Sequence, residues 1–121
     1  MSEPQPLKTR TKQYALNIIK QVGLLPQAMV AQTLGKQLLR SGTSVGANYR
    51  EGSQARSDAE MIAKFGICIQ ELEESAYWLE LLDEAKLVTQ DLIAPLLDET
   101  NQLTAIFVAS IKRLAKNQKS R

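Results

Sequence analysis

Apolar residues recur along this chain at intervals of three and four, the period of a helix that buries one face. The clearest run consists of six apolar residues: Ile62, Phe65, Ile69, Leu72, Ala76 and Leu79. Their spacings of 3, 4, 3, 4 and 3 form a heptad seam, which packs helices at a crossing angle of about 20°. Ser57 precedes the seam as an N-cap, and Glu60 completes a capping box. The pattern predicts a long helix that begins after Ser57.

Three further segments carry the same period, and we expect each to form a helix. The first runs from Leu7 to a stop at Gly23, the second from about Pro26 into the region of Gly52, and the last follows a cap at Thr89. Their expected core positions are Leu7, Tyr14, Ile18 and Val22 in the first, Val30, Leu34, Leu38 and Val45 in the second, and Leu92, Leu96, Leu103, Phe107 and Leu114 in the last.

Four helices joined by short connections are typical of antiparallel neighbours. The sequence therefore predicts an all-α fold, an up-down-up-down antiparallel four-helix bundle over residues 7–116. Residues 1–6 are expected to form a disordered tail and residues 117–121 a basic tail.

Three glycines interrupt the second predicted helix, at Gly35, Gly42 and Gly46, and each costs about 1 kcal/mol relative to alanine in a helix interior. Two interpretations remain open. The glycines allow close approach of another helix or subunit, or they mark a distortion that exposes the backbone to a ligand.

Composition adds few constraints. The 121 residues suffice for one domain, and 44% hydrophobic with 23% charged residues is ordinary for a globular protein. No apolar run reaches the roughly 18 to 20 residues that span a bilayer, and the first residues lack the apolar core of a secretory signal. Cys68, the only cysteine, falls within a helical pattern and is expected to act as a small buried hydrophobe. We therefore expect a cytoplasmic protein without a membrane partner.

Charge is segregated along the chain, although the net charge is only +2. Residues 1–56 hold eight Lys/Arg and two Asp/Glu, residues 57–99 hold two and eleven, and residues 100–121 hold five and none. Eight basic residues are candidates for phosphate contact: Lys8, Arg10, Lys12, Lys36, Arg56, Lys112, Arg113 and Lys116. In an antiparallel bundle the first and last helices bring residues 8–12 near residues 112–116. The alternative is a basic face that is merely solvated.

No catalytic set assembles from the sequence. The chain has no histidine, which removes the usual general base and a common metal ligand. Glu51, Glu71 and Glu74 resemble part of a di-iron carboxylate cluster, but such sites require Glu-x-x-His pairs. We expect no enzymatic activity, no cofactor and no metal.

Polar residues in the second and third helices have a structural explanation. If the two helices fold back near residue 55, Arg40 lies opposite Glu71 and within a turn of Glu74. The same register places Arg50 near Glu60, and Asn48 at the level of Ile62. We predict that Arg40 pairs with Glu71 or Glu74, as a structural or subunit-interface contact. Arg50, Glu51 and Asn48 are assigned to the same structural set.

Tyr77 and Trp78 are adjacent, so their side chains leave a helix about 100° apart. One is expected to join the core while the other lies on a second apolar surface. A protein–protein contact is the favoured use of that surface. Stacking on a nucleic-acid base is the alternative, disfavoured because RNA-stacking aromatics usually lie on sheets or in exposed grooves.

The segment from Arg40 to Leu82 resembles a known family. The matching motifs are RSGTSVGAN followed by YREG, then ARSDAE, then E-x-x-ES-x-YWLELL. They resemble the four-helix-bundle family of 23S ribosomal RNA intervening-sequence proteins, which is related to the accessory variability proteins of diversity-generating retroelements. The resemblance implies a ring-like homopentamer and, for the retroelement branch, binding to nucleic acid and to a reverse transcriptase. We therefore expect a non-enzymatic, oligomeric accessory protein that binds the backbone of RNA or DNA. The alternative is a protein-interaction or scaffold module without a nucleic-acid role.

Overall fold

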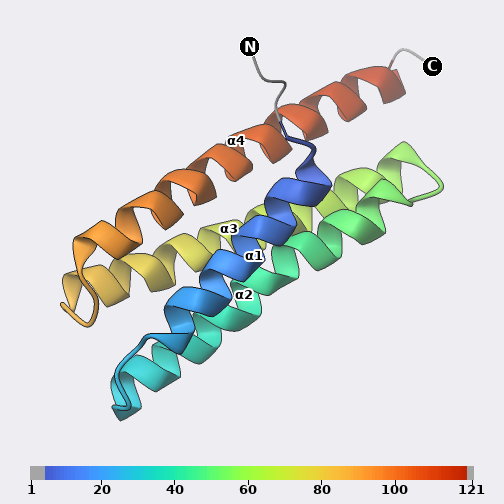
Figure 1. The fold of residues 1–121 in the computed structure, drawn as a ribbon. Coiled ribbons are helices and arrows are strands. Elements are labelled where there is room, and N and C mark those ends of the chain that lie inside the picture. Colours follow the sequence, from blue (N-terminus) through green and yellow to red (C-terminus); the bar gives the residue numbers. More distant parts are fainter. Residues whose placement is uncertain (1–4, 120–121) are drawn as a thin grey trace.

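A computed structural model describes residues 5–119, and within that range the chain forms four helices and no strand. The helices are α1 (Leu7–Gly23), α2 (Met29–Ser53), α3 (Asp58–Glu84) and α4 (Gln90–Lys119). Successive helices run in opposite directions, so the start of α1, the α2–α3 connection and the end of α4 gather at one end (Figure 1). The predicted all-α, antiparallel four-helix bundle is confirmed.

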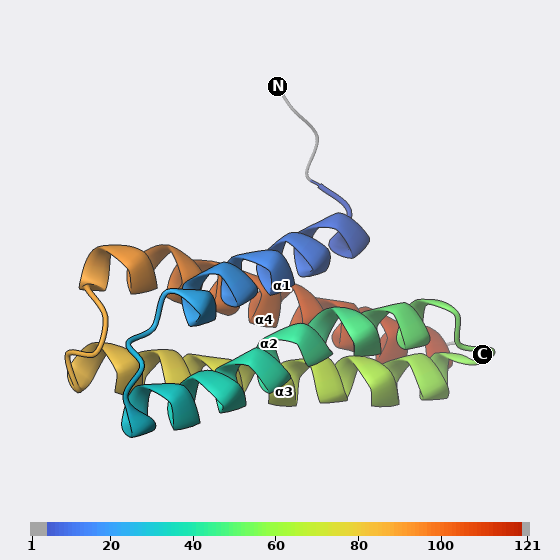
Figure 2. The ribbon, with the colours of Figure 1, turned by 60° about the horizontal axis from the view of Figure 1, so that its bottom comes forward.

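Each helix packs against the next along the chain, and α4 closes the bundle against α1 (Figure 2). The α2–α3 hairpin makes the most extensive contact and the α1–α4 pair the least. α1 has 17 residues whereas α4 has 30, and α1 packs more extensively against α2 than against α4. The shorter helix leaves part of the groove along α4 uncovered. Within residues 5–119, no helix combines the length and hydrophobicity needed to span a membrane.

The ends of two helices differ from the expected boundaries. α2 begins at Met29 rather than near Pro26. Leu25 is buried in the core against Gly35. This contact holds the residues from Leu25 to the start of α2 in a connection. At the other extreme, α4 continues to Lys119, three residues beyond the predicted end of the bundle at 116. Of the predicted tails, at residues 1–6 and 117–121, residues 1–4 and 120–121 lie outside the described residues.

The start of α3 is capped largely as predicted. The Ser57 Oγ accepts a hydrogen bond from the Glu60 N–H at 3.1 Å. The Glu60 carboxylate reaches back to the N–H of Arg56, at 3.4 Å, rather than to that of Ser57. Both exposed N–H groups are thus satisfied, although the return bond lies one residue earlier than in the usual capping box.

The core stripe of α3 is rotated relative to the predicted heptad seam. Six residues are buried: Phe65, Cys68, Leu72, Ser75, Leu79 and Leu82. Phe65, Leu72 and Leu79 were predicted, whereas Ile62, Ile69 and Ala76 lie half-buried at the flank. Both sets have the same heptad spacing, so periodicity alone does not choose between them. The positions of α2 and α4 decide the choice, and they place two small residues, Cys68 and Ser75, at the centre.

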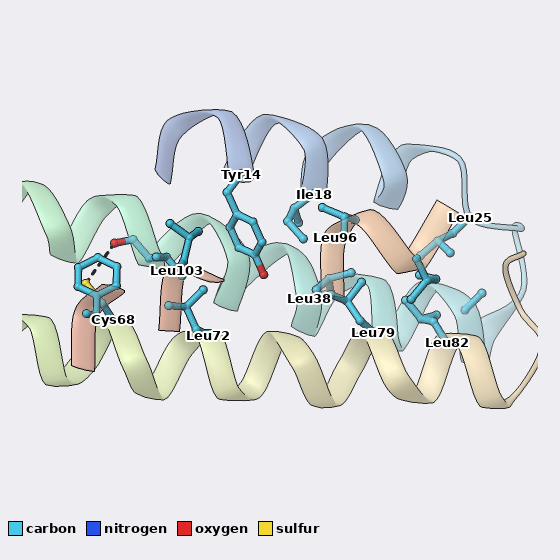
Figure 3. Close-up of a cluster of buried hydrophobic side chains, with 14 of the residues drawn as sticks. Tyr14, Ile18, Leu25, Leu38, Cys68, Leu72, Leu79, Leu82, Leu96 and Leu103 are labelled. Atoms are coloured by element: carbon cyan, nitrogen blue, oxygen red, sulfur yellow. Dashed lines mark hydrogen bonds between the residues drawn. The ribbon is translucent and has the colours of Figure 1, made fainter. Parts of the chain in front are cut away.

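One-residue errors of the same kind occur in α2 and α4. Val30 is 54% exposed and Leu92 is 40% exposed, while the neighbouring Ala31 and Ile93 are buried. A one-residue shift turns a side chain by about 100°, which moves it from the core to solvent. The remaining large core side chains, including Tyr14, Ile18 and Leu38, interdigitate between the helices (Figure 3).

Three of the four glycines of α2, at 35, 42 and 46, face α1 or the connection that follows it at close range. A Cβ atom at Gly42 would lie 2.8 Å from the Ile18 Cγ1, and one at Gly35 would lie 2.6 Å from the Leu25 Cδ1. Gly46 lies against Thr11 in the same way, with 3.4 Å to its Oγ1. Because α2 remains a continuous helix through all three positions, the glycines serve close helix packing and not backbone distortion.

Cys68 is fully buried, as expected for a small hydrophobe. Its Sγ lies 3.4 Å from the Val45 carbonyl oxygen, to which the thiol donates (Figure 3). Burial raises the pKa of this thiol to about 12, so the reactive thiolate is disfavoured.

Candidate functional site

The fold converts charge segregation along the sequence into charge segregation between the two ends of the bundle. One end comprises the start of α1, the α2–α3 hairpin tip and the end of α4, at residues 7–14, 46–66 and 107–119. These residues contain ten Lys/Arg and three Asp/Glu, whereas the remaining residues from 15 to 106 contain four and nine. We call the first end the basic end and the second the acidic end.

Most of the predicted phosphate-contacting residues lie at the basic end. Its exposed members are Lys8, Lys12, Arg56, Lys112, Arg113 and Lys116. The start of α1 and the end of α4 meet there, because Leu7, Arg113 and Lys116 line one pocket. Leu7 lies just before the range 8–12, so the expected proximity of residues 8–12 and 112–116 stays a prediction.

Two of the predicted residues do not join this group. Arg10 points to α4, where its Nε donates to the Glu99 Oε2 at 3.1 Å and its Nη2 bonds the other carboxylate oxygen. The Gln102 Oε1 accepts a third bond, at 3.1 Å. The Glu99 hydrogen bond raises the pKa of Arg10 and occupies its guanidinium. Lys36 is exposed on the first half of α2, at the acidic end.

Arg40 bridges α2 and α3 in the predicted way. Its Nη2 lies 3.0 Å from the Glu74 Oε1, and its Nη1 lies 3.5 Å from the Glu71 Oε2. Partial burial and the neighbouring Glu74 raise the pKa of Glu71, and Arg40 only partly offsets this rise. One arginine therefore serves two carboxylates, of which Glu71 is the more enclosed.

The expected proximity of Arg50 and Glu60 produces no contact in the structure. The Glu60 carboxylate turns back to its own helix start, and within residues 5–119 the Arg50 side chain forms no ion pair. Glu51 instead pairs with Lys64 at 3.5 Å across the hairpin. The register of the hairpin near its tip differs by about one helical turn from that assumed in the sequence, since Glu51 meets Lys64. Arg50 lies on the side of α2 that faces α1, where it lines a pocket with Thr11 and Lys12.

Asn48, Tyr77 and Trp78 complete the predicted structural set. Asn48 is half-buried, and its Nδ2 donates to the Ser44 carbonyl one turn earlier, at 2.9 Å. Tyr77 is 54% exposed, whereas Trp78 packs against the core. Their rings lie 5.2 Å apart between centroids. The predicted division of this aromatic pair between core and surface is confirmed.

The pocket at the basic end was not anticipated from the sequence. It has a volume of about 370 Å³ and is lined from all four helices. Its apolar wall includes Tyr49, Met61 and Phe65. Of these, Tyr49 belongs to the YREG motif and Phe65 was expected in the core, whereas Met61 had no predicted role. The sequence contains only weak evidence for this pocket, because these three residues are distant from Leu7 and Leu114 along the chain. They come together only in the folded bundle.

In the described part of the chain, no three His, Cys, Asp or Glu residues gather closely enough to hold a metal ion. The arrangement of side chains thus offers cations, an aromatic surface and buried hydroxyls. Such groups bind anions and planar apolar rings.

Comparison with known proteins places this fold in a family. Over residues 7–109 the chain matches the family described as 23S rRNA-intervening sequence protein, and it belongs to that family. It is also similar to the crystal structure of a protein with unknown function from the S23 ribosomal protein family of Bacteroides thetaiotaomicron VPI-5482. That structure has a TM-score of 0.83 and 33% sequence identity, and the match covers 88% of this chain and 99% of the other. Among curated proteins, none matches the sequence.

Proposed function

We propose that this protein is a non-enzymatic accessory protein that binds the phosphate backbone of nucleic acid through its basic end. The observation that carries the proposal is the excess of ten Lys/Arg over three Asp/Glu at that end. Cations on helix surfaces position a protein on phosphates without reading the base sequence. The family description names 23S rRNA, which makes RNA the first ligand to test.

The contacts are assigned to exposed cations on two neighbouring helices and the hairpin tip. Lys8 and Lys12 lie on α1, Lys112 and Arg113 lie on α4, and Arg56 lies in the α2–α3 connection. Arg10 is left out because Glu99 already occupies its guanidinium, and Lys36 is left out because it lies at the acidic end.

Self-association is part of the proposal. The resemblance implies a homopentameric ring, in which five basic ends would act together on one polyanion. A reverse transcriptase is a partner by analogy with the retroelement branch alone. The cytoplasm is the compartment in which such an accessory protein would meet RNA.

A protein-interaction or scaffold role is the second candidate. The outer face of α1 supports it, because Leu16 and Ile19 are each 48% exposed on the side opposite the core. Tyr77 adds an exposed aromatic ring on α3. Aromatic and aliphatic side chains of this kind anchor protein interfaces.

Fluorescence anisotropy with labelled RNA and duplex DNA, at about 50 and 200 mM salt, tests the proposal. Five phosphate contacts predict that duplex affinity falls about 500-fold between these salt concentrations. The double variant Lys112→Ala/Arg113→Ala should reduce the slope of log affinity against log salt by about 2. The matched variant Lys20→Ala/Lys36→Ala removes the same charge from the acidic end and should leave that slope unchanged. No binding of either nucleic acid at the lower salt would reject the proposal in favour of the scaffold.

A further inference from the structure

The pocket at the basic end has one apolar side and one cationic side. Leu7, Tyr49, Met61 and Leu114 supply apolar groups from four different helices, and Arg113 and Lys116 lie at the rim. Among the described residues that line the pocket, none carries a carboxylate. The pocket lies where the start of α1 meets the last turns of the longer helix α4.

The apolar side is a rigid aromatic surface. The Tyr49 ring stacks on the Phe65 ring, with 5.9 Å between centroids and 14° between planes. Phe107 meets both rings edge-on from α4, at centroid distances of 6.1 Å from Tyr49 and 5.2 Å from Phe65. Phe65 and Phe107 are buried, whereas Tyr49 is half-buried and lines the pocket. Tyr49 is therefore held by two buried rings and presents its remaining surface to a ligand.

The cationic side is also oriented. The Arg113 Nη2 donates to the Ser110 Oγ at 3.3 Å, one turn earlier on α4, which holds the guanidinium at the mouth of the pocket. A ligand that fits both sides has a planar aromatic ring, which can stack on Tyr49, and an anion attached to it. A nucleotide has this chemistry, and its base stacks on aromatic side chains while its phosphate contacts the cations.

We infer that this pocket receives one unpaired base of a single-stranded nucleic acid, whose flanking phosphate contacts Arg113 and Lys116. The inference rests on the proposed function and narrows it to single-stranded or bulged segments. Bases in a duplex are stacked and paired, so they are not free to enter a pocket on a protein surface. An aromatic surface accepts any base, so the site distinguishes single strands from duplexes but does not distinguish one base sequence from another.

Anisotropy with three labelled probes of equal length separates the inference from the proposed function. The probes are a 12-nucleotide oligothymidine, the same strand with every base replaced by an abasic site, and a 12-base-pair duplex. Base stacking predicts that oligothymidine binds about 5- to 150-fold more tightly than the abasic strand. Equal affinities for the two strands would overturn the inference while leaving the backbone-binding function intact. Failure of all three probes to bind at about 50 mM salt would overturn both.

A second measurement locates the base. Met61 lines the pocket, whereas Met29 is 81% exposed at the acidic end, so methyl-¹³C methionine spectra contain a reporter and an internal control. Added oligothymidine should shift the Met61 methyl resonance and leave that of Met29 in place. A base preference without a Met61 shift would overturn the assignment to this pocket.

The variant Tyr49→Leu keeps an apolar side chain and removes the aromatic surface. It should reduce the affinity for oligothymidine to that for the abasic strand, while the affinity for the abasic strand stays as in the parent protein. Unchanged abasic binding also shows that the variant is folded. Retention of the base preference by this variant would overturn the role of Tyr49.

Discussion

The Tyr14 hydroxyl on α1 and the Thr100 hydroxyl on α4 lie 2.7 Å apart inside the core, where both residues are almost fully buried. The Thr100 Oγ1 also lies 2.6 Å from the Leu96 carbonyl, to which it donates its single proton. The Tyr14 O–H is therefore the donor to Thr100. This bond joins the two helices that otherwise make the least contact.

The bond belongs to a layer of hydroxyls to which each helix contributes one residue. Ser41 on α2 and Ser75 on α3 lie 2.8 Å apart between their Oγ atoms. Burial raises the pKa of Tyr14, and the neighbouring hydroxyls of Thr100 and Ser75 moderate this rise. Buried polar groups are costly unless paired, so this layer favours one register of the four helices over sliding alternatives.

Tyr14→Phe should destabilise the protein by about 1–2 kcal/mol, because it removes the donor to Thr100 and leaves a buried hydroxyl oxygen without its partner. Urea denaturation followed by circular dichroism measures this difference. Tyr77→Phe is the matched control, since Tyr77 is exposed and should change stability by less than about 0.5 kcal/mol. Equal effects of the two substitutions would contradict the importance of the hydroxyl layer.

Gly42→Ala should destabilise the protein by about 1–3 kcal/mol, since the added Cβ would lie 2.8 Å from the buried Ile18 side chain. Gly66→Ala, in α3, meets nothing within 4 Å and should instead stabilise by up to about 1 kcal/mol. Thermal denaturation of the two variants provides the comparison. A gain of stability at Gly42 would show that α1 and α2 can separate without loss of packing.

Arg40→Ala should cost about 0.5–1 kcal/mol, the range of partly exposed ion pairs, because it leaves Glu71 and Glu74 facing each other. Melting temperature and gel-filtration volume report stability and assembly together. Lys36→Ala removes the same charge one turn earlier on α2, where the side chain has no ion-pair partner in the described chain. If Arg40→Ala behaves like Lys36→Ala in both assays, the bridge has no structural role.

Glu71→Gln should stabilise the protein at pH 7. Burial and Glu74 raise the pKa of Glu71 above its ordinary value of 4.5, so ionisation is less favourable in the folded chain than in the unfolded chain. The stability associated with the protonated group is present below pH 4.5 and is lost as the pH rises through the folded pKa. The stabilisation by Glu71→Gln should therefore decrease as the pH falls towards 4.5.

The exposed carboxylate of Glu73, two residues further along α3, supplies the control variant Glu73→Gln. Denaturation curves of both variants at several pH values between about 4 and 7 give the comparison. A loss of stability in Glu71→Gln at pH 7 would mean that its pairing with Arg40 outweighs burial and the repulsion from Glu74.

Local sequence features were sufficient to predict the four helices and the contacts near the middle of the α2–α3 hairpin. Ser57 sets the start of α3 through capping, which depends on a few neighbouring residues, and α1 ends at Gly23 as predicted. Arg40 was matched to Glu71 and Glu74 because two helices joined by a short turn have a nearly fixed register. Near the tip of the hairpin a shift of one turn was enough to place Lys64, and not Arg50, beside an acidic partner.

By itself, the sequence determined the number of helices, their directions and the family, because periodicity, capping and motif spacing are properties of neighbouring residues along one chain. Only the tertiary structure decided which of two heptad stripes on α3 is buried, since both satisfy the same period and the choice depends on the helices packed around it. It also decided that Glu99 occupies Arg10, that four hydroxyls share one layer, and that Tyr49, Met61 and Arg113 surround one pocket. These relationships join residues from different helices, and their distances are set by the packing of the whole bundle.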